Sequence, residues 1–354
     1  MNSIISEDVK NILANDLDWE RFRGKTVLIT GASGMIPSYI LYTFLMMNDM
    51  KDLGVKVLAL VRNREKAERI LRSVLDRDDI DLIVQDVCDP VYYDGPVDYI
   101  FHGGSAARPA AHKSSPTSTI KANLLGTFNL LELARDKGSE GFVLMSSSEV
   151  YGKTDDDSKA ITENDYGALD ILDTRSCSSE GKRAAETISS CYNAEFGIKV
   201  TAARFAHIYG PGLALDDGRV QADFAANVMR DEDIVMNSDG SSVRAYTYVA
   251  DAVAGVFFAL IKGDEIAYNI ADSDGIVSIR ELAEAFVGSR PEKGLKVQCR
   301  ITNDTGRSYS PVKFTGLDSS RLKSLGWEPH VHVKEGCARM ISYYEEVEKA
   351  EADR

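Results

Sequence analysis

Short apolar segments rich in β-branched residues alternate with longer amphipathic segments over the first 204 residues of this chain. The apolar segments predict a buried strand at 25–30 and further strands at 55–61, 81–85, 97–102, 141–146 and 199–204, of which 81–85 is the weaker one. Helices are expected after residue 34 and at 63–75, 117–136 and 175–195. This alternation is typical of a parallel sheet with helices on both faces. The sequence therefore predicts the α/β class, with a doubly wound parallel sheet.

The alternation becomes irregular after residue 204, where the segment 210–218 is rich in turn-forming residues. At roughly 100–200 residues per domain, 354 residues allow two domains. We predict that residues 1–204 form one domain, with about 243–262 returning to it. Residues 205–354 are expected to form mainly a smaller C-terminal lobe.

The charge balance excludes some classes of partner. The chain has 41 Lys and Arg against 55 Asp and Glu, so its formal net charge is −14. Nucleic acids and anionic membrane surfaces attract basic proteins, so we expect neither as a partner. No segment reaches the roughly 18 apolar residues that a membrane span needs. A local arginine cluster would still allow an anionic small substrate.

The five cysteines are widely spaced and form no CxxC motif, which favours free thiols in a reducing cytoplasm. The first 22 residues carry early acids and no long apolar run, so a signal peptide is not expected there. His330 and His332 lie two residues apart near the C-terminus. This spacing favours a solvated segment over a metal site, and no metal site is predicted.

A glycine-rich turn, GASGMIP, separates the first expected strand from the first helix. Gly31 and Gly34 allow positive φ and let a pyrophosphate approach the backbone. The following helix N-terminus offers unpaired N–H groups to the same anion. Pro37 replaces the small third residue of the usual pattern but is tolerated in a first helical turn. The turn thus predicts a dinucleotide site.

The residue that follows the second expected strand is Arg62. An acidic residue at this point would bind the ribose 2′-hydroxyl of NAD, whereas an arginine suits a 2′-phosphate. We therefore expect NAD(P) as the cofactor, with a preference for NADP. The alternative is that Arg62 and Arg64 are solvated charges at the start of a helix.

Six blocks in order give the chain a resemblance to a known family. It resembles the extended short-chain dehydrogenases/reductases that act on nucleotide sugars, a Rossmann-fold family, and is most similar to their UDP-glucuronate decarboxylase and dTDP-glucose 4,6-dehydratase branch. The resemblance spans roughly residues 25–327. The blocks are TGASG (30–34), SSSEVYG (146–152), RSCSSEGKRAAE (175–186), ARFAHIYGPG (203–212), DDGRV (216–220) and VRAYTYVAD (243–251).

The resemblance implies catalytic roles within SSSEVYG. Ser147 and Ser148 match positions that contact or polarise the substrate, and Glu149 matches an acid/base carboxylate. Dehydratases of this group usually have Asp where this chain has Ser148, which favours a decarboxylase-like site. Epimerases usually lack the glutamate, so Glu149 disfavours simple 4-epimerisation.

In RSCSSEGKRAAE, Lys182 matches the family lysine that binds the nicotinamide ribose and lowers the pKa of a tyrosine four residues earlier. This chain has Ser178 at that position. A phenol near pKa 10 needs such a cation to act as a base, and serine is far less acidic. An engineered base-deleted variant, which we favour, and a natural divergence both remain open. Tyr151 and Tyr166 are possible substitutes without the helical spacing to Lys182.

Further roles follow from the resemblance. His207, Arg219 and Arg244 match positions that bind the nucleotide sugar, the two arginines through its diphosphate. A homodimer through helices 117–136 and 175–195 is implied, although intrachain packing would leave the same pattern. Besides Lys182, cofactor contacts are expected at Gly31, Ser33, Gly34, Met35, Ile36, Arg62, Asp86, Val87 and Gly103.

The prediction is therefore a cytoplasmic NAD(P)-dependent enzyme that modifies a nucleotide diphospho-sugar through a 4-keto intermediate. Its outcome would be decarboxylation, dehydration or epimerisation. Two alternatives stay open: a nucleotide-sugar ketoreductase, and a catalytically silent protein that binds NAD(P) and a nucleotide sugar.

Overall fold

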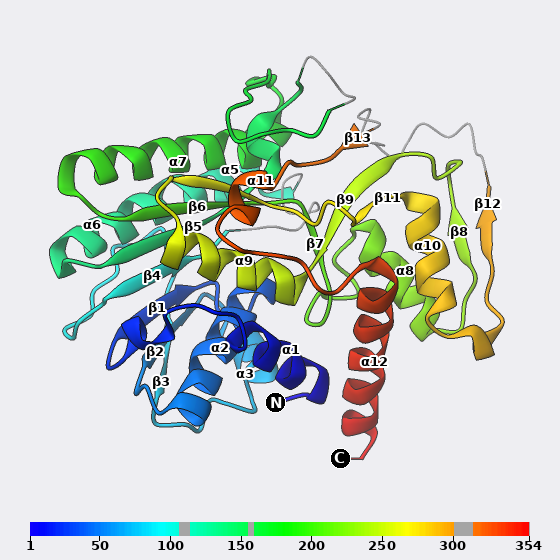
Figure 1. Ribbon diagram of the computed structural model, residues 1–354, viewed down its shortest axis with the longest axis horizontal. Helices are drawn as coiled ribbons and strands as arrows, with labels where there is room; N and C mark the ends of the chain where they lie inside the picture. The colour runs from blue at the N-terminus through cyan, green and yellow to red at the C-terminus, as the bar shows by residue number, and fades with distance from the viewer. Residues whose placement is uncertain (106–113, 155–158, 301–313, 354) are drawn as a thin grey trace.

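A seven-stranded parallel sheet forms the centre of the molecule, seen in a computed structural model that describes residues 1–105, 114–154, 159–300 and 314–353 (Figure 1). Its strand order is β3-β2-β1-β4-β5-β6-β10. This is the doubly wound arrangement, so the predicted fold class is confirmed. The strands are β1 (Thr26–Thr30), β2 (Lys56–Val61), β3 (Ile80–Val84), β4 (Tyr99–His102), β5 (Gly141–Ser147), β6 (Val200–Phe205) and β10 (Ala267–Ile270).

Helices cover both faces because successive side chains of each strand point in opposite directions. Val27 and Ile29 of β1 join the core cluster formed with α1, α2 and α9, while Leu28 joins the cluster formed with α6 and α7. The helices around the sheet are α1 (Ser3–Leu13), α2 (Met35–Lys51), α3 (Arg64–Ile70), α5 (Pro116–Lys121), α6 (Thr127–Lys137), α7 (Cys177–Phe196) and α9 (Val249–Lys262). Among the residues described, no helix is long and apolar enough to span a bilayer.

The helix expected at 117–136 contains a departure from regular geometry. Its middle is a π-helical turn, η2 (Ala122–Gly126), with α5 before it and α6 after it. Gly126 packs against Val87 and His102 at this point, since a Cβ there would lie 2.9 Å from Val87 Cγ2 and 3.4 Å from His102 Cε1. Such wide turns are rare and are frequent at functional sites.

The C-terminal part of the chain forms smaller sheets beside the main one, on the right in Figure 1. Strands β7, β9, β11 and β13 form one sheet, and β8 pairs with β12. Since β10 joins the main sheet, the chain returns to it after α9. These elements are β7 (His207–Tyr209), α8 (Val220–Met229), β8 (Ile234–Met236), β9 (Val243–Tyr248), β11 (Ile276–Ser278), α10 (Ile279–Gly288), β12 (Val297–Cys299), β13 (Phe314–Thr315), α11 (Ser320–Lys323) and α12 (Val333–Ala352).

Helix α1 links the main sheet layer to the C-terminal helix. The buried carboxylate of Asp8 accepts hydrogen bonds from the hydroxyls of Tyr39 in α2 and Tyr248 in β9, each at 2.8 Å. It also accepts one from Arg339 of α12 at 2.6 Å. Burial raises the pKa of Asp8, while Arg339 and the two hydroxyls lower it. The Asp8 side chain thus hydrogen-bonds to residues of three other elements, α2, β9 and α12.

Candidate active site

The strand order reverses between β1 and β4, so the loops that follow these strands diverge and leave a crevice at the carboxyl edge of the sheet. Gly31, with φ +65°, follows β1, and Gly103 follows β4. A Cβ on Gly31 would lie 2.6 Å from the Gly103 carbonyl oxygen, and one on Gly103 would lie 2.7 Å from Pro37 Cγ. Only glycine fits at both positions, because the space that a Cβ would take is filled by neighbouring parts of the chain, and the loops after β1 and β4 therefore pack closely together.

The N-terminus of α2 opens into this crevice. Gly34 caps the helix without a side-chain hydrogen bond, and its N–H donates to the Gly31 carbonyl at 2.7 Å. Ser33, Met35 and Ile36 complete the turn, and Pro37 occupies the first helical turn as expected. The glycine cradle and the helix end fit the pyrophosphate of a dinucleotide.

Arg62 and Asp86 stand at the ends of β2 and β3. The Arg62 side chain is 71% exposed, and its Nη1 lies 3.8 Å from an Asp86 carboxylate oxygen. The Cys88 backbone N–H donates to Asp86 and, with Arg62, lowers the pKa of that carboxyl against its burial. Val87 is buried and packs near Gly104 and Gly126. Arg62 is therefore accessible to an anion, in competition with Asp86.

The predicted catalytic residues meet where β5 ends and α7 begins. Ser147 caps the 3₁₀ helix η3 (Ser148–Tyr151) by accepting from the Glu149 N–H at 3.2 Å, and the Glu149 side chain is exposed. Ser178 and Lys182 are both buried, one helical turn apart on α7. Lys182 Nζ donates to the Met145 carbonyl of β5 at 2.6 Å.

Burial lowers the pKa of Lys182 to about 8, although Glu186 and Glu149 act in the opposite direction. His102, at the end of β4, is close enough to feel the charge of this lysine. Burial and the Lys182 charge lower its pKa to about 3, so the imidazole stays neutral. Its Nδ1 is 2.8 Å from Thr30 Oγ1. Lys182 is thus an ammonium group that loses its proton more easily than an exposed lysine does.

Sequence reasoning missed the ionic network beneath these residues. Glu186 pairs with Arg204 at 2.6 Å and accepts from the Ser146 hydroxyl at 2.5 Å. Arg204 also donates to the Glu163 carbonyl at 3.0 Å. The available signal was Glu186 itself, four residues after Lys182 and therefore on the same helical face.

Neither tyrosine considered as a substitute base is suited to that role. The Tyr151 hydroxyl donates to Asn269 Oδ1 at 2.6 Å and accepts from Arg204 at 2.9 Å. Burial raises its pKa to about 12, against the effect of Arg204. Tyr166 is 84% exposed on the loop before α7. Neither Tyr151 nor Tyr166 therefore supplies the phenol that position 178 lacks.

The three predicted substrate residues come together in the smaller part of the molecule. Burial, followed by the positive charges of Arg244 and Arg219, lowers the pKa of His207 to about 4. Arg219 caps α8 and forms a two-point ion pair with Asp217, one contact being 3.0 Å. Arg244 is half-buried and donates to the Val243 carbonyl at 2.8 Å. The cluster therefore presents two cations beside a neutral imidazole.

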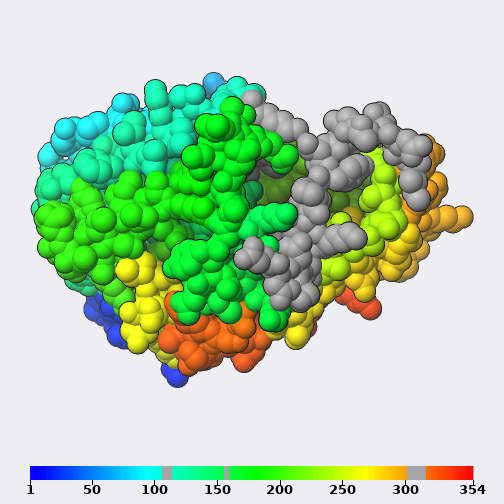
Figure 2. All heavy atoms as spheres, turned by 90° about the horizontal axis from the view of Figure 1, so that it is seen from above, coloured from blue at the N-terminus to red at the C-terminus, as the bar shows by residue number. Residues whose placement is uncertain are grey.

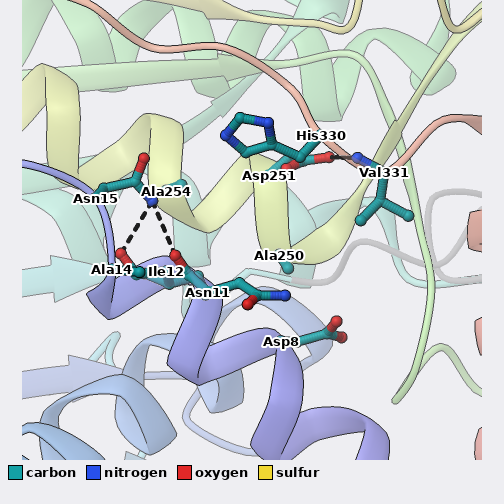
Figure 3. Close-up of a pocket in the computed structure, with 10 residues that line it drawn as sticks. All are labelled: Asp8, Asn11, Ile12, Ala14, Asn15, Ala250, Asp251, Ala254, His330 and Val331. Atoms are coloured by element: carbon teal, nitrogen blue, oxygen red, sulfur yellow. Dashed lines mark hydrogen bonds between the residues drawn. The ribbon is translucent and has the colours of Figure 1, made fainter.

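Seen from above, the surface is hollowed between segments of the main sheet layer and the smaller C-terminal part (Figure 2). A separate pocket lies between α1, α9 and the chain near residue 330 (Figure 3). It contains none of the predicted cofactor, catalytic or substrate residues. Its lining consists of Asp8, Asn11, Ile12, Ala14, Asn15, Ala250, Asp251, Ala254, His330 and Val331.

Comparison with known proteins agrees with this arrangement. The NAD dependent epimerase/dehydratase family matches residues 27–271. UDP-glucuronic acid decarboxylase 6 of Arabidopsis thaliana is 34% identical over 316 residues, covering 89% of this chain and 87% of the relative. UDP-glucuronic acid decarboxylase 1 of Xenopus tropicalis is 30% identical, covering 90% of this chain and 72% of the relative.

Solved structures share the fold. The Thermotoga maritima UDP-glucose 4-epimerase, crystallised with UDP-glucose, has a TM-score of 0.74 at 23% identity and covers 91% of this chain and 99% of its own. The Bacillus anthracis dTDP-glucose 4,6-dehydratase, in complex with NAD, has a TM-score of 0.75 at 19% identity and covers 92% and 98%. The glycine crevice, the lysine on α7 and the match over 27–271 lead to one conclusion: this chain belongs to the NAD-dependent epimerase/dehydratase family.

Proposed function

We propose that the protein is an NAD(P)-dependent enzyme that oxidises C4 of a nucleotide diphospho-sugar and acts on the resulting 4-keto sugar, with decarboxylation as the favoured outcome. The observation that carries this proposal is buried Lys182, held by β5 beside Glu149 and Ser178 at the carboxyl edge of the sheet. Relatives named UDP-glucuronic acid decarboxylases support the choice of outcome. Ser148, where dehydratases of this group usually have an acid, supports it too.

The cofactor site is proposed along the carboxyl edge of β1 to β4. Gly31, Gly34 and the α2 N-terminus would hold the pyrophosphate, and Lys182 the nicotinamide ribose. When bound, NAD(P) supplies a hydride acceptor that later returns the hydride. Arg62 would pair with a 2′-phosphate, so we propose a preference for NADP within this NAD-dependent family.

The substrate diphosphate is proposed to bind at Arg219 and Arg244. Planar guanidinium groups meet phosphate oxygens two at a time, and the low pKa of His207 keeps that imidazole neutral at physiological pH. A neutral imidazole can donate to or accept from the sugar nucleotide without adding charge. Arg219 would exchange part of its contact with Asp217 for the phosphate.

Ser178 and Lys182 are proposed to remove the C4 hydroxyl proton together. Lys182, with a pKa of about 8, is neutral in about a tenth of molecules at pH 7. Its amine can take the Ser178 hydroxyl proton as Ser178 takes that of the sugar. Glu149 is proposed as the second acid/base group, with Ser147 and Ser148 as hydrogen-bond partners of the sugar.

Product analysis tests the proposal. The enzyme with NAD or NADP would be incubated with UDP-, dTDP-, CDP- and GDP-sugars, including UDP-glucuronic acid, and the products identified by mass. Ser178→Tyr should raise turnover by about 10²- to 10⁴-fold because it restores a phenol beside Lys182. Ser178→Ala serves as the matched control and should stay at or below the starting rate.

Two other outcomes define the alternatives. A reduced sugar nucleotide as the end product would indicate a ketoreductase. If Ser178→Tyr turns over no sugar nucleotide while cofactor and substrate still bind, the chain is a binding protein. The missing phenol is the observation that keeps this second function in view.

We also propose a cytoplasmic homodimer. Leu125, Phe128 and Phe196 lie exposed on η2, α6 and α7, along the helices expected to form the interface. None of the five cysteines, all of them among the described residues, forms a disulfide, which suits a reducing compartment. Light scattering should give twice the chain mass, and Phe128→Glu should halve it; a monomer in both cases would refute the dimer.

A further inference from the structure

Two aspartates and a histidine converge on the side of the sheet edge formed by β10. Asp272 and Asp274 lie in the turn between β10 and β11, and His332 caps the N-terminus of α12. One ligand atom from each residue lies within 4.8 Å of the other two. These residues belong to neither the cofactor crevice nor the arginine cluster.

The geometry suits a metal ion. His332 Nδ1 lies 3.2 Å from Asp272 Oδ2. Ligand atoms bound to one tetrahedral zinc at about 2.0–2.2 Å lie about 3.3–3.6 Å apart, so these two atoms need to move by only a few tenths of an ångström. The Asp274 carboxylate is exposed and can turn toward them.

The aspartate turn is held in place before any ligand binds. Asp272 Oδ1 accepts from the Asp274 N–H at 2.8 Å, and the Asp272 N–H donates to Thr247 Oγ1 at 2.9 Å. Gly275 then passes close to Tyr246, since a Cβ on it would lie 2.0 Å from the Tyr246 carbonyl oxygen. Asp272 is therefore already held in position, and binding of a ligand would restrict it little further.

The negative charges around this turn would be stabilised by a bound cation. Asp272 and nearby Asp251 are both buried, and the Asp272 charge helps to raise the pKa of Asp251, after the larger effect of burial. Within the described part of the chain, neither of them, nor Asp274, forms an ion pair with lysine or arginine. Lys323 lies nearby, but its Nζ donates to Ser273 Oγ at 2.8 Å. Buried carboxylates are normally paired or coordinate a metal.

We propose that Asp272, Asp274 and His332 bind a divalent transition-metal ion of the zinc, cobalt and manganese class, with water in the remaining positions. An imidazole beside two carboxylates favours these ions over magnesium and calcium. The side chain of His332 is 54% exposed, so the ion can reach the site from solvent. The site joins the edge of the main sheet to α12 and is independent of the proposed catalysis.

The linear sequence concealed this grouping. The two-residue spacing of His330 and His332 favours a solvated segment and gives no sign of a carboxylate partner. The carboxylate that meets His332 is 60 residues upstream. His332 is exposed, as expected for a solvated segment, and among the described residues its ring, not that of His330, groups with the two carboxylates.

Cobalt(II) titration of the chelator-treated full-length chain tests the proposal. Wild type should bind one cobalt ion, with visible bands but without the intense near-ultraviolet band of thiolate ligation, which separates this site from the exposed Cys191 and Cys299. His332→Ala and Asp274→Asn should weaken binding at least tenfold, whereas the neighbouring His330→Ala should bind like wild type.

Thermal unfolding gives a second readout. Cobalt or zinc should raise the melting temperature of wild type and His330→Ala but not of His332→Ala, and all three should melt alike in chelator. Absence of saturable binding to wild type at about 0.1 mM cobalt, or equal affinity in His332→Ala, would overturn the proposal. Thiolate bands as the only signal would do the same.

Discussion

Ser178 stands where the family resemblance implies a tyrosine. Its neighbours keep the expected arrangement: Lys182 is buried against β5, Glu149 follows the strand, and Glu186 is neutralised by Arg204. A hydroxyl of ordinary acidity gains much less from the Lys182 charge than a phenol would. We therefore expect Ser178 to slow proton removal, while the side chains around it keep the arrangement described above.

Arg62→Asp is expected to lower NADP affinity by about 10- to 100-fold and to shift preference toward NAD, because it removes a charge-assisted contact to the 2′-phosphate. Asp86→Asn should raise NADP affinity, since Asp86 competes for the same guanidinium at 3.8 Å. Arg64→Asp is the matched control, as Arg64 faces Glu68 on α3. Cofactor titration by calorimetry measures all three, and unchanged affinities in Arg62→Asp would refute the 2′-phosphate role.

At the scale of elements, the positions of the strands were predictable from the sequence, whereas the irregular turn within one helix was not. The strand expected at 81–85 is β3 at Ile80–Val84, an edge strand in which only Ile80 is buried, and its apolar, β-branched residues still identify it. The π-helical turn within the helix expected at 117–136 was not predicted. At this turn Gly126 packs against Val87 and His102, which are distant in sequence, so no local pattern indicates the contact.

The candidate site shows the same division. The glycine turn and Lys182 were predictable, because a local motif defines each of them. The Glu186–Arg204–Tyr151 network and the Asp272–His332 pair were not, since each joins residues from different elements. Short sequence motifs identify the residues that are expected to contact a ligand. The residues that hold those side chains in position come from distant parts of the chain, and motifs identify them less directly.

The first turn of α9 contains a carboxyl whose titration should be measurable. Burial raises the pKa of Asp251 from 3.8 to about 6, although the Val331 N–H lowers it. The folded state then binds the proton more tightly between these values, so the free energy of unfolding falls as pH rises through about 4 to 6. The total effect is about 3 kcal/mol.

Asp251→Asn should remove this pH dependence of the free energy of unfolding, because asparagine keeps an acceptor for the Val331 N–H without the charge. Its free energy of unfolding at pH 7 is expected to equal or exceed that of wild type. Urea unfolding at pH 4.5, 5.5 and 7 in chelator measures the difference between the two proteins. Parallel profiles across this range would show that Asp251 titrates normally.

At the scale of the whole molecule, the N-terminal segment makes polar contacts that join the main sheet layer to the C-terminal helix. Asp8 connects α2, β9 and α12 through one carboxylate, and Asn2 of the same N-terminal segment donates to Glu346 of α12 at 2.7 Å. None of the residues in these contacts is one of the predicted cofactor, catalytic or substrate residues.

Asp8→Asn is expected to lower the free energy of unfolding by about 3 kcal/mol, because it leaves the partly buried Arg339 without its main partner. Glu7→Gln is the matched control. Glu7 contacts the same arginine at 3.4 Å but is exposed, so its loss should cost less than about 1 kcal/mol. Denaturant unfolding of both variants checks this, and equal losses would assign no special role to the buried carboxylate.

The position of Asp8 has a consequence for exchanging segments between relatives. The family match begins at residue 27, yet two of the three groups that bind Asp8, Tyr39 and Tyr248, lie inside it. A chimera that grafts residues 27–271 onto another family member would carry two buried hydroxyls whose acceptor stayed behind. Such a graft would need α1 as well, or phenylalanine at both tyrosine positions.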